Sequence, residues 1–278
     1  MPKRVRGLLV LLGLALAPLP GWGQEEEGLF AGLLSLGDLL LPDRTQLTVG
    51  AGPRFGPDYL GSDDYEVAPD LALFVRFGDK FILESDGASL DILGLSDIQF
   101  GPVVRYSGGR NDNANEALTG LGDISGSLDF GAFVKARVAN RFTARLRYSH
   151  ALIGGDNGGL LDLQFNTLLY NVEPLAVVLS LRGSVAEPRR ARRFFGISEE
   201  QSLESGLPEF DPGTSLQDIR LTLGARWQFT PKWSVNAFTR YTRLTGDIVD
   251  SPIIKPLGSR NQFTIGAVLA YTFEFEFD

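Results

Sequence analysis

The chain has 278 residues, a formal net charge of −8 and no cysteine, and 44% of its residues are hydrophobic. A sequence without cysteine excludes disulfide frameworks, thiolate metal sites and cysteine nucleophiles. The acidic balance argues against a nucleic-acid partner, because affinity for phosphates comes from an excess of Lys and Arg. The hydrophobic content is typical of a folded chain and leaves the class of fold open.

Residues 1–23 have the pattern of a cleaved secretory signal peptide. Three basic residues open the chain, the apolar run 7–17 follows, and Gly21 and Gly23 occupy the small-residue positions of a cleavage site. The apolar run is too short to span the hydrocarbon core of a bilayer, about 30 Å, as a helix. We therefore expect a secreted chain that begins at Gln24. Because the junction has no cysteine, we do not expect a lipoprotein.

Residues 24–44 precede the first predicted strand and contain the apolar stretch 28–41. Leu29, Leu33 and Leu36 follow helical spacing, yet further apolar residues cover most sides of such a helix, so it cannot remain in water. We expect a periplasmic or interfacial segment, either a short helix on the inner leaflet or a surface for a periplasmic partner. A third possibility, that this segment plugs the mouth of a barrel, is less favoured, because a leucine-rich surface suits a positively charged, arginine-lined lumen badly.

The remainder of the sequence predicts membrane strands. No uncharged apolar stretch after residue 24 approaches the length of a membrane helix, so a membrane form must be a closed barrel. From Ile219 to Phe229, apolar side chains alternate with polar ones such as Arg220 and Arg226, over the length of a tilted membrane strand. About twelve segments of this kind occur, at roughly 45–55, 67–77, 80–85, 88–93, 97–107, 123–138, 141–152, 160–170, 175–186, 216–229, 232–245 and 260–275.

The connections between these segments alternate in length, as a barrel requires. The short ones are Gly78 to Asp79, Gly94 to Ser96, Ala139 to Asn140, Asn171 to Pro174 and Thr230 to Pro231, and the long ones include 56–66, 108–122, 187–215 and 246–259. One tight turn, Asp86-Gly87, is expected on the long-loop side. We expect the short turns in the periplasm and the long loops outside.

These patterns predict an all-β fold: a transmembrane antiparallel β-barrel of about 12 strands with closed up-and-down topology, over residues 45–278. A soluble β-sandwich is the alternative, but its strands are usually shorter. The predicted location is the outer membrane of a Gram-negative cell, with outer-membrane lipid around the barrel.

Basic side chains dominate the positions of inward parity. They are Arg54, Arg76, Arg105, Lys135, Arg137, Arg145, Arg147, Arg182, Arg220, Arg226 and Arg240, against the acids Asp70, Glu84, Asp91, Asp129 and Asp162. Two interpretations stay open. In the first, which we favour for a narrow barrel, these charges pair in ladders that fill the lumen. In the second, the lumen is a vestibule that attracts anions.

The sequence offers no convincing catalytic or metal site. His150 is the single histidine, and its neighbour Ser149 points to the opposite face of a strand, so the two cannot form a Ser-His pair. The oxygen-rich loop 111–116 lacks the glycine of a calcium loop and contains ordinary turn formers. We therefore expect no catalytic residue, no metal and no cofactor.

The closing strand carries a biogenesis signal. It sets a polar residue, a glycine and spaced apolar or aromatic groups at Thr264, Gly266, Leu269, Tyr271 and Phe273. This arrangement resembles the signal that the outer-membrane barrel assembly machinery recognises, which implies that machinery as a partner during biogenesis. Such barrels commonly end on Phe, whereas here residues 274–278 extend past Phe273.

Several segments together resemble one family. The first long loop supplies Pro57, Asp58, Tyr59, Leu60, Gly61, Ser62, Asp63, Asp64 and Tyr65, and the last supplies Gly246, Asp247, Asp250, Ser251 and Pro252. Further matches are 120–124, 191–196, 205–207, 261–263 and 271–273. In this order, from about residue 45 to 273, they are similar to the MipA/OmpV family of outer-membrane proteins.

The resemblance implies a non-enzymatic scaffold for peptidoglycan remodelling. The family's namesake looks like a scaffold that joins a lytic transglycosylase and a penicillin-binding protein, and no family motif supplies catalytic residues. The rival expectation is a small-solute channel or uptake protein with a positively charged lumen, based on the inward basic residues.

Deletion of residues 25–42 tests the expected role of the segment before the barrel. Because the predicted strands begin near residue 45, the shortened barrel is expected to insert and to resist heat in detergent. It is expected to lose binding to envelope partners. Gel mobility with and without heating checks folding, and pull-down from solubilised envelopes checks binding. A deletion variant that fails to fold would place this segment in the core of the barrel.

Overall fold

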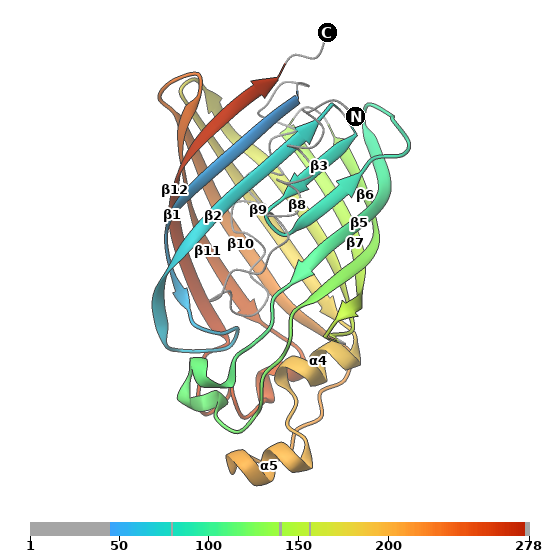
Figure 1. Cartoon of the computed structure of the whole chain (residues 1–278), viewed down its shortest axis with the longest axis vertical. Coiled ribbons are helices and arrows are strands. Elements are labelled where there is room, and N and C mark those ends of the chain that lie inside the picture. The colour runs from blue at the N-terminus through green and yellow to red at the C-terminus, as the bar shows by residue number, and fades with distance from the viewer. Residues whose placement is uncertain (1–44, 79, 139–140, 156, 276–278) are drawn as a thin grey trace, which may run out of the picture.

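The protein is described from a computed structural model, which covers residues 45–78, 80–138, 141–155 and 157–275. The predicted signal peptide 1–23, the segment 24–44 and the turn residues Asp79, Ala139 and Asn140 lie outside the described residues. Within these ranges, twelve strands form a closed barrel in the order β1-β12-β11-β10-β9-β8-β7-β6-β5-β4-β3-β2 (Figure 1). Neighbouring strands are antiparallel throughout.

The strands and helices have these bounds. The strands are β1 (Thr45–Pro57), β2 (Tyr65–Phe77), β3 (Phe81–Glu84), β4 (Gly87–Leu90), β5 (Ile98–Ser107), β6 (Ser127–Val138), β7 (Phe142–Gly154), β8 (Gly159–Val172), β9 (Leu175–Ala186), β10 (Ser215–Gln228), β11 (Trp233–Leu244) and β12 (Asn261–Phe275). The long loops contain the 3-10 helices η1 (Asp112–Ala114), η2 (Glu116–Leu118) and η4 (Asp247–Asp250), and the helices α4 (Pro188–Phe195) and α5 (Glu199–Ser205). The predicted fold and all twelve predicted strands are confirmed, with ends that differ by a few residues.

The hairpin of β3 and β4 differs from its prediction by one position. The sequence predicts Asp86-Gly87 as the turn, whereas the structure pairs Glu84 with Gly87 and places Ser85 and Asp86 in the turn. Gly87 is required for a close approach instead, because a Cβ at this position would lie 2.1 Å from the carbonyl oxygen of Val104. The hairpin is therefore where the sequence predicts it, but Gly87 is the first residue of β4 and not a residue of the turn.

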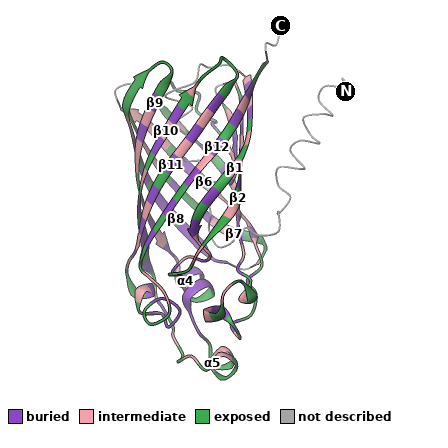
Figure 2. Ribbon diagram, turned by 90° about the vertical axis from the view of Figure 1, so that its left-hand side faces the viewer, coloured by how far each residue is buried: buried purple, intermediate pink, exposed green. Residues whose placement is uncertain are grey.

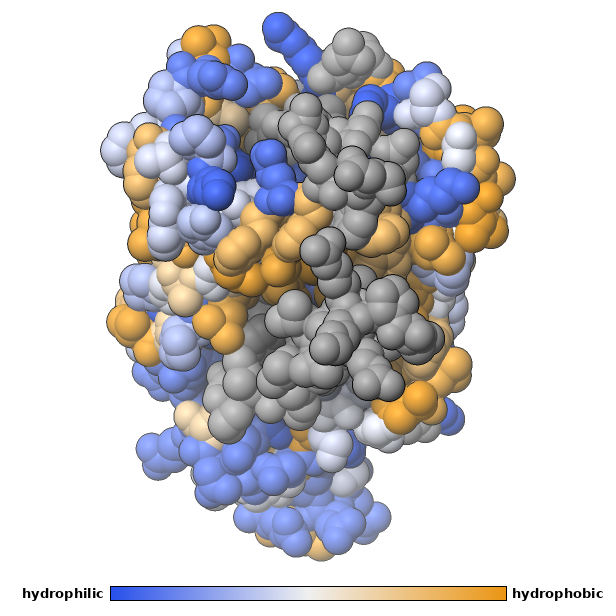
Figure 3. Space-filling model, turned by 45° about the horizontal axis from the view of Figure 1, so that its top comes forward, coloured by the Kyte–Doolittle hydropathy of each residue, from blue (hydrophilic) through white to orange (hydrophobic). Residues whose placement is uncertain are grey.

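Burial alternates along the strands, as Figure 2 shows. On β12, Gln262 and Thr264 are buried while Phe263 and Ile265 are exposed. The buried positions face the lumen, and the exposed apolar ones form the outer wall of the barrel. Figure 3 shows such apolar side chains on the wall and a hydrophilic surface over the protruding loop region below it.

Aromatic pairs lie on the outer wall near both ends of β11 and β12. At the turn end, the rings of Trp233 and Tyr271 lie 4.9 Å apart, and at the loop end, those of Tyr241 and Phe263 lie 5.0 Å apart. Aromatic side chains at both levels are typical of the membrane interfaces of an outer-membrane barrel. Among the residues that the structure describes, no helix is long and apolar enough to cross a membrane.

Because the β3-β4 hairpin is short, part of β2 has an unpaired edge in the barrel wall. β2 pairs with β3 only over 74–77, so its loop-end half has no strand on that side in the described chain. Ser85 ends the pairing by accepting a hydrogen bond from the backbone N–H of Leu73 at 3.0 Å. Pro69 lies in the unpaired half, where a residue without an N–H is tolerated. Val67, 72% exposed, marks the same edge.

The two faces of β7 give a direct test of the membrane placement. The exposed Leu146 lies on the outer wall and the buried Thr143 faces the lumen. Leu146→Lys is expected to destabilise the barrel by about 2–4 kcal/mol, because a cation enters hydrocarbon near mid-strand. Thr143→Lys, the matched control, is expected to cost clearly less. Denaturant unfolding in lipid vesicles measures both, and equal costs would contradict the placement of Leu146 in lipid.

Candidate interaction site: a capped and charge-filled lumen

The long loops build a hydrophobic core over one end of the barrel. Its buried members are Tyr59, Leu118, Leu121, Ile124, Leu160, Ala186, Ala191, Phe194, Phe195, Ile197, Leu244, Ile248, Ile253 and Ile254. They come from all four long loops and from the adjoining ends of β8, β9 and β11. We call this cluster the loop cap. It lies with α4 at the lower end of the barrel in Figure 1.

The two loop segments with the clearest family resemblance meet in the loop cap. Tyr59 Oη donates to the carbonyl oxygen of Ile253 at 2.9 Å. The backbone N–H of Ser259 donates to Gly61 at 2.7 Å, and Ser251 Oγ donates to the carbonyl of Phe195 in α4 at 2.6 Å. These contacts join the first, third and fourth long loops across the mouth of the barrel.

The remaining motif residues have structural positions. Asn115 Nδ2 donates to Asp58 at 2.7 Å and to Asp64 at 3.0 Å, which ties the second long loop to the first. Pro57 and Tyr65 bracket the first loop as strand ends, Ser62 and Pro252 are buried, and Asp63 is exposed. Gly246 has a positive φ of 65°, Asp247 N–H donates to Ser215 at 2.9 Å, and Asp250 pairs with Lys255 on the surface.

A buried arginine ties the second loop to α4. Arg110 Nη1 donates to the carbonyl oxygen of Phe194 at 2.8 Å. Burial lowers the pKa of Arg110 to about 10, and burial likewise raises the pKa of Tyr59. This hydrogen bond fixes the position of α4, because without it the buried guanidinium of Arg110 would lose its acceptor, which is energetically unfavourable.

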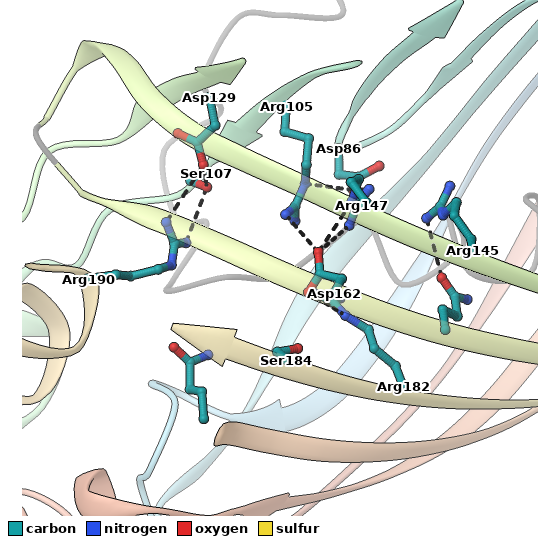
Figure 4. Close-up of polar contacts among 12 residues, drawn as sticks. Asp86, Arg105, Ser107, Asp129, Arg145, Arg147, Asp162, Arg182, Ser184 and Arg190 are labelled. Atoms are coloured by element: carbon teal, nitrogen blue, oxygen red, sulfur yellow. Dashed lines mark hydrogen bonds and ion pairs between the residues drawn. The ribbon is translucent and has the colours of Figure 1, made fainter. Parts of the chain in front are cut away.

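α4 also sends a side chain into the lumen. Arg190 is 1% exposed, and its Nη1 lies 3.7 Å from Oδ2 of Asp129 on β6. Ser107 and Ser127 each donate to Asp129 at 2.6 Å. Arg190 Nη2 donates to Ser107 Oγ at 3.3 Å (Figure 4). The charged group therefore anchors the loop cap to the barrel wall.

Asp162 on β8 is the centre of a second network, deeper in the lumen. It accepts from Arg105 at 3.4 Å, from Arg147 at 3.1 Å and from Arg182 Nε at 3.0 Å. Asp86, in the β3-β4 turn, lies 3.5 Å from both Arg105 and Arg147 (Figure 4). Two carboxylates thus hold three arginines from β5, β7 and β9 together.

The eleven candidate basic residues have different surroundings. Eight are buried and Lys135, Arg137 and Arg145 are half-buried. The structure brings Arg105, Arg147 and Arg182 together, and it pairs Arg145 with Glu84 at 3.7 Å and Arg220 with Asp218 at 2.9 Å. Arg240 Nε donates to Thr222 at 3.2 Å. Arg54 and Arg76 lie on β1 and β2, and Arg226 lies near the opposite end of the lumen.

Towards the turn end the lumen contains apolar side chains. Ala72, Phe74, Val178, Phe238, Val268 and Ala270, from β2, β9, β11 and β12, form one buried cluster. We call this the lumen cluster. Gly224 pairs with both Phe238 and Val178 in the ladder. Apolar packing inside the barrel narrows the path that water or solutes could take.

His150 lies on the outer face, away from the lumen. Its Nδ1 is 3.2 Å from Oε2 of Glu187, which also accepts from Tyr148 Oη at 2.6 Å. The hydrogen bond from Tyr148 lowers the pKa of Glu187. Ser149 is buried on the opposite face, so the two neighbours do not face each other. Among the described residues, no group of three or more His, Cys, Asp or Glu side chains could hold a metal ion.

Sequence reasoning missed three polar residues of these networks. Asp86 was assigned to a turn, and the shortness of its hairpin, which brings the turn down to the level of Arg105, could have indicated its role. Arg190 and Arg110 lie in loops, where strand parity gives no direction for a side chain. Only the alternation of basic and apolar residues in 188–195 hints that α4 has a buried face.

Replacement of Asp162 by Asn tests the central network. The variant leaves Arg105, Arg147 and Arg182 with one carboxylate fewer, and we expect a loss of about 3–5 kcal/mol in unfolding free energy. Asp250→Asn is the matched control, because its pair with Lys255 is exposed and such pairs contribute at most about 1 kcal/mol. Denaturant unfolding in detergent or lipid measures both. Equal losses would show that the lumen network contributes no more than a surface pair.

Comparison with known proteins gives one broad match and two short ones. A family model described as MltA-interacting protein MipA matches residues 49–273. Proteins named MltA-interacting protein from Escherichia coli (strain K12) and Shigella flexneri are each 38% identical over 61 residues. That alignment covers 22% of this chain and 24% of each relative, so it spans about a quarter of the relatives' length.

Solved structures with similar folds include two bacterial barrels. The NanC porin aligns with a TM-score of 0.44 and 8% identity, over 83% of this chain and 100% of that one. The translocator domain of the autotransporter NalP from Neisseria meningitidis aligns with a TM-score of 0.44 and 10% identity, over 98% of both chains. Likenesses at this level carry no argument about function. The family match, in contrast, covers most of the chain, and the protein therefore belongs to the MltA-interacting protein MipA family of outer-membrane β-barrels.

Proposed function

We propose that this protein is a non-enzymatic outer-membrane scaffold that holds enzymes of peptidoglycan remodelling at the membrane. The partner class that we propose is a lytic transglycosylase, supported by the name of the family and of two relatives, MltA-interacting protein. A penicillin-binding protein is the second proposed partner, by the resemblance described above.

The observation that carries this proposal is the blocked lumen. The loop cap covers one end with fourteen buried side chains, the Asp162 network links β5, β7, β8 and β9 in the loop-end half of the lumen, and the lumen cluster packs towards the turn end. A protein that conducts solutes needs a continuous polar path, whereas a scaffold needs a rigid body with accessible ends. The arrangement supports the scaffold over the channel.

The predicted orientation gives the partners a surface. If the short turns lie in the periplasm, they and the segment 24–44 are the parts that periplasmic enzymes reach. The loop cap and α5 then lie outside, on the far side of the membrane from peptidoglycan. The proposed binding surface is accordingly the turn end.

The small-solute channel is the second candidate, and a specific observation favours it. Eleven basic residues lie in buried or half-buried positions, an excess that suits an anion path once the loop cap opens. An enzyme is the least supported class, because His150 faces away from the lumen and, among the described residues, has only Glu187 and Tyr148 as polar contacts. His150→Ala is expected to leave any hydrolase activity unchanged.

Planar-bilayer recording and site-specific cross-linking together test the scaffold. The refolded full chain is expected to show no discrete conductance steps, because the lumen is filled. A photo-reactive residue at Thr230, in the β10-β11 turn, is expected to cross-link a lytic transglycosylase in intact envelopes. The matched control carries the photo-reactive residue in place of Leu203, which is exposed on α5, and is expected to cross-link no transglycosylase.

Two outcomes would contradict the proposal. Regular conductance steps that depend on the lumen arginines would favour the channel. Capture of the transglycosylase from Leu203, and not from Thr230, would place the partner on the opposite side of the membrane from the one proposed.

A further inference from the structure

A cavity of about 440 Å³ lies at the turn end of the barrel, between the β8-β9 and β10-β11 turns. Its lining includes Asn171, Glu173, Ala176, Arg226 and Gln228. The backbone N–H of Gln228 donates to Pro174 at 2.8 Å and joins the two turns. The volume falls in the range of small-molecule sites, about 300–1,000 Å³. The loop cap is at the other end of the barrel, so this cavity lies at the end where the described residues form no such cap.

Arg226 distinguishes this cavity from the rest of the lumen. Its side chain is 8% exposed, and no carboxylate of the described chain forms an ion pair with it. Its Nε is buried without a hydrogen-bond partner, as is the Nε of Arg105 and of Arg220, so the missing ion pair is the difference. Arg182 and Arg220, on the same or the adjacent strand, each have a carboxylate partner. A buried cation without an ion pair is costly, so the carboxylate pairing that explains Arg182 and Arg220 does not explain Arg226.

The lumen cluster separates Arg226 from the Asp162 network. In the β9-β10 ladder, Arg226 pairs with Ala176, and the next inward pair is Gly224 with Val178, a member of the lumen cluster. Arg226 therefore lies next to the lumen cluster on one side and lines the cavity at the turns on the other.

Two further groups define the ligand. Gln228 lines the cavity with Arg226; its Nε2 donates to the carbonyl of Pro231 at 3.1 Å and carries a second N–H. Glu173 lines the cavity from the turn, is exposed, and forms no ion pair with Arg226. A guanidinium and an amide N–H match the two oxygens of a carboxylate, and a separate carboxylate at the rim matches an ammonium.

We infer that this cavity binds the free carboxylate of a short peptide or amino acid, with Arg226 as its main contact and Glu173 facing the amino group. The inference does not depend on the scaffold role, because it concerns a small ligand and not a protein partner. It gives the turn end a binding function of its own.

Calorimetric titration of the refolded full chain in detergent tests the inference with alanyl-alanine as the probe. We expect saturable binding with a dissociation constant of about 1 mM or tighter. Alanyl-alanine amide, which lacks the carboxylate, is expected to bind at least about 10-fold more weakly. N-acetyl-alanyl-alanine, which lacks the ammonium, is expected to bind about 3-fold more weakly.

Arg226→Gln is expected to weaken binding of alanyl-alanine at least about 10-fold and to keep or raise the temperature at which the barrel unfolds. Arg145→Gln, a lumen arginine that already pairs with Glu84 and Gln164, is the matched control and is expected to leave binding unchanged. An Arg226 that served only the fold would lower the unfolding temperature when replaced and would leave peptide binding intact.

Four results would overturn the inference: no saturable binding to the native chain, equal binding of the amide, equal binding to Arg226→Gln, or phosphate binding as tight as the dipeptide with the same dependence on Arg226. The last would make the cavity a general anion site. Equal binding of the acetylated peptide would remove Glu173 from the proposed site.

Discussion

The closed hydrogen-bond ladder is the constraint on which the rest of the molecule depends. In hydrocarbon no water is available to backbone N–H and C=O groups, so each strand must pair on both sides and the last must return to the first. β12 pairs with β1 from Thr45 to Phe55 and completes the ring. Because successive side chains point to opposite faces, the apolar set that meets lipid leaves every second position for the lumen. The same ladder thus makes the wall apolar and the interior polar.

An interior built in this way must neutralise its own charges. The arginines of β5, β7 and β9 would repel one another across the lumen, and Asp162 and Asp86 offset that repulsion from two directions. The hairpin of β3 and β4 is short enough to bring Asp86 to the level of Arg147. Its shortness also leaves the loop-end half of β2 unpaired on one side, where Pro69 removes a donor. The shortness of the hairpin therefore places Asp86 beside the lumen arginines, but it also leaves part of β2 without a neighbouring strand on one side.

Period-two alternation and turn residues were sufficient to predict the twelve strands, since each half of the pattern reports one face of the wall. They also predicted which bases are inward, but parity does not state which acid each base meets. The loop cap was beyond this reasoning. Tyr59 and Ile253 are far apart in the sequence and lie in loops, where no periodicity assigns a buried face. Their motifs were visible only as a resemblance, and the structure gives those motifs a physical role as packing contacts of the loop cap.

The two ends of the lumen are built on different principles, and this difference bears on function. At the loop end, Arg190 is buried against Asp129 and Arg110 against a backbone carbonyl, so charge and packing support each other. At the turn end, Arg226 is buried, lines a cavity and forms no ion pair with a carboxylate of the described chain. A charged group that is already paired or hydrogen-bonded rigidifies a structure, whereas a buried cation without an ion pair gains when an anion arrives. Stability is thus concentrated at the loop cap, and the capacity to bind is concentrated at the turns.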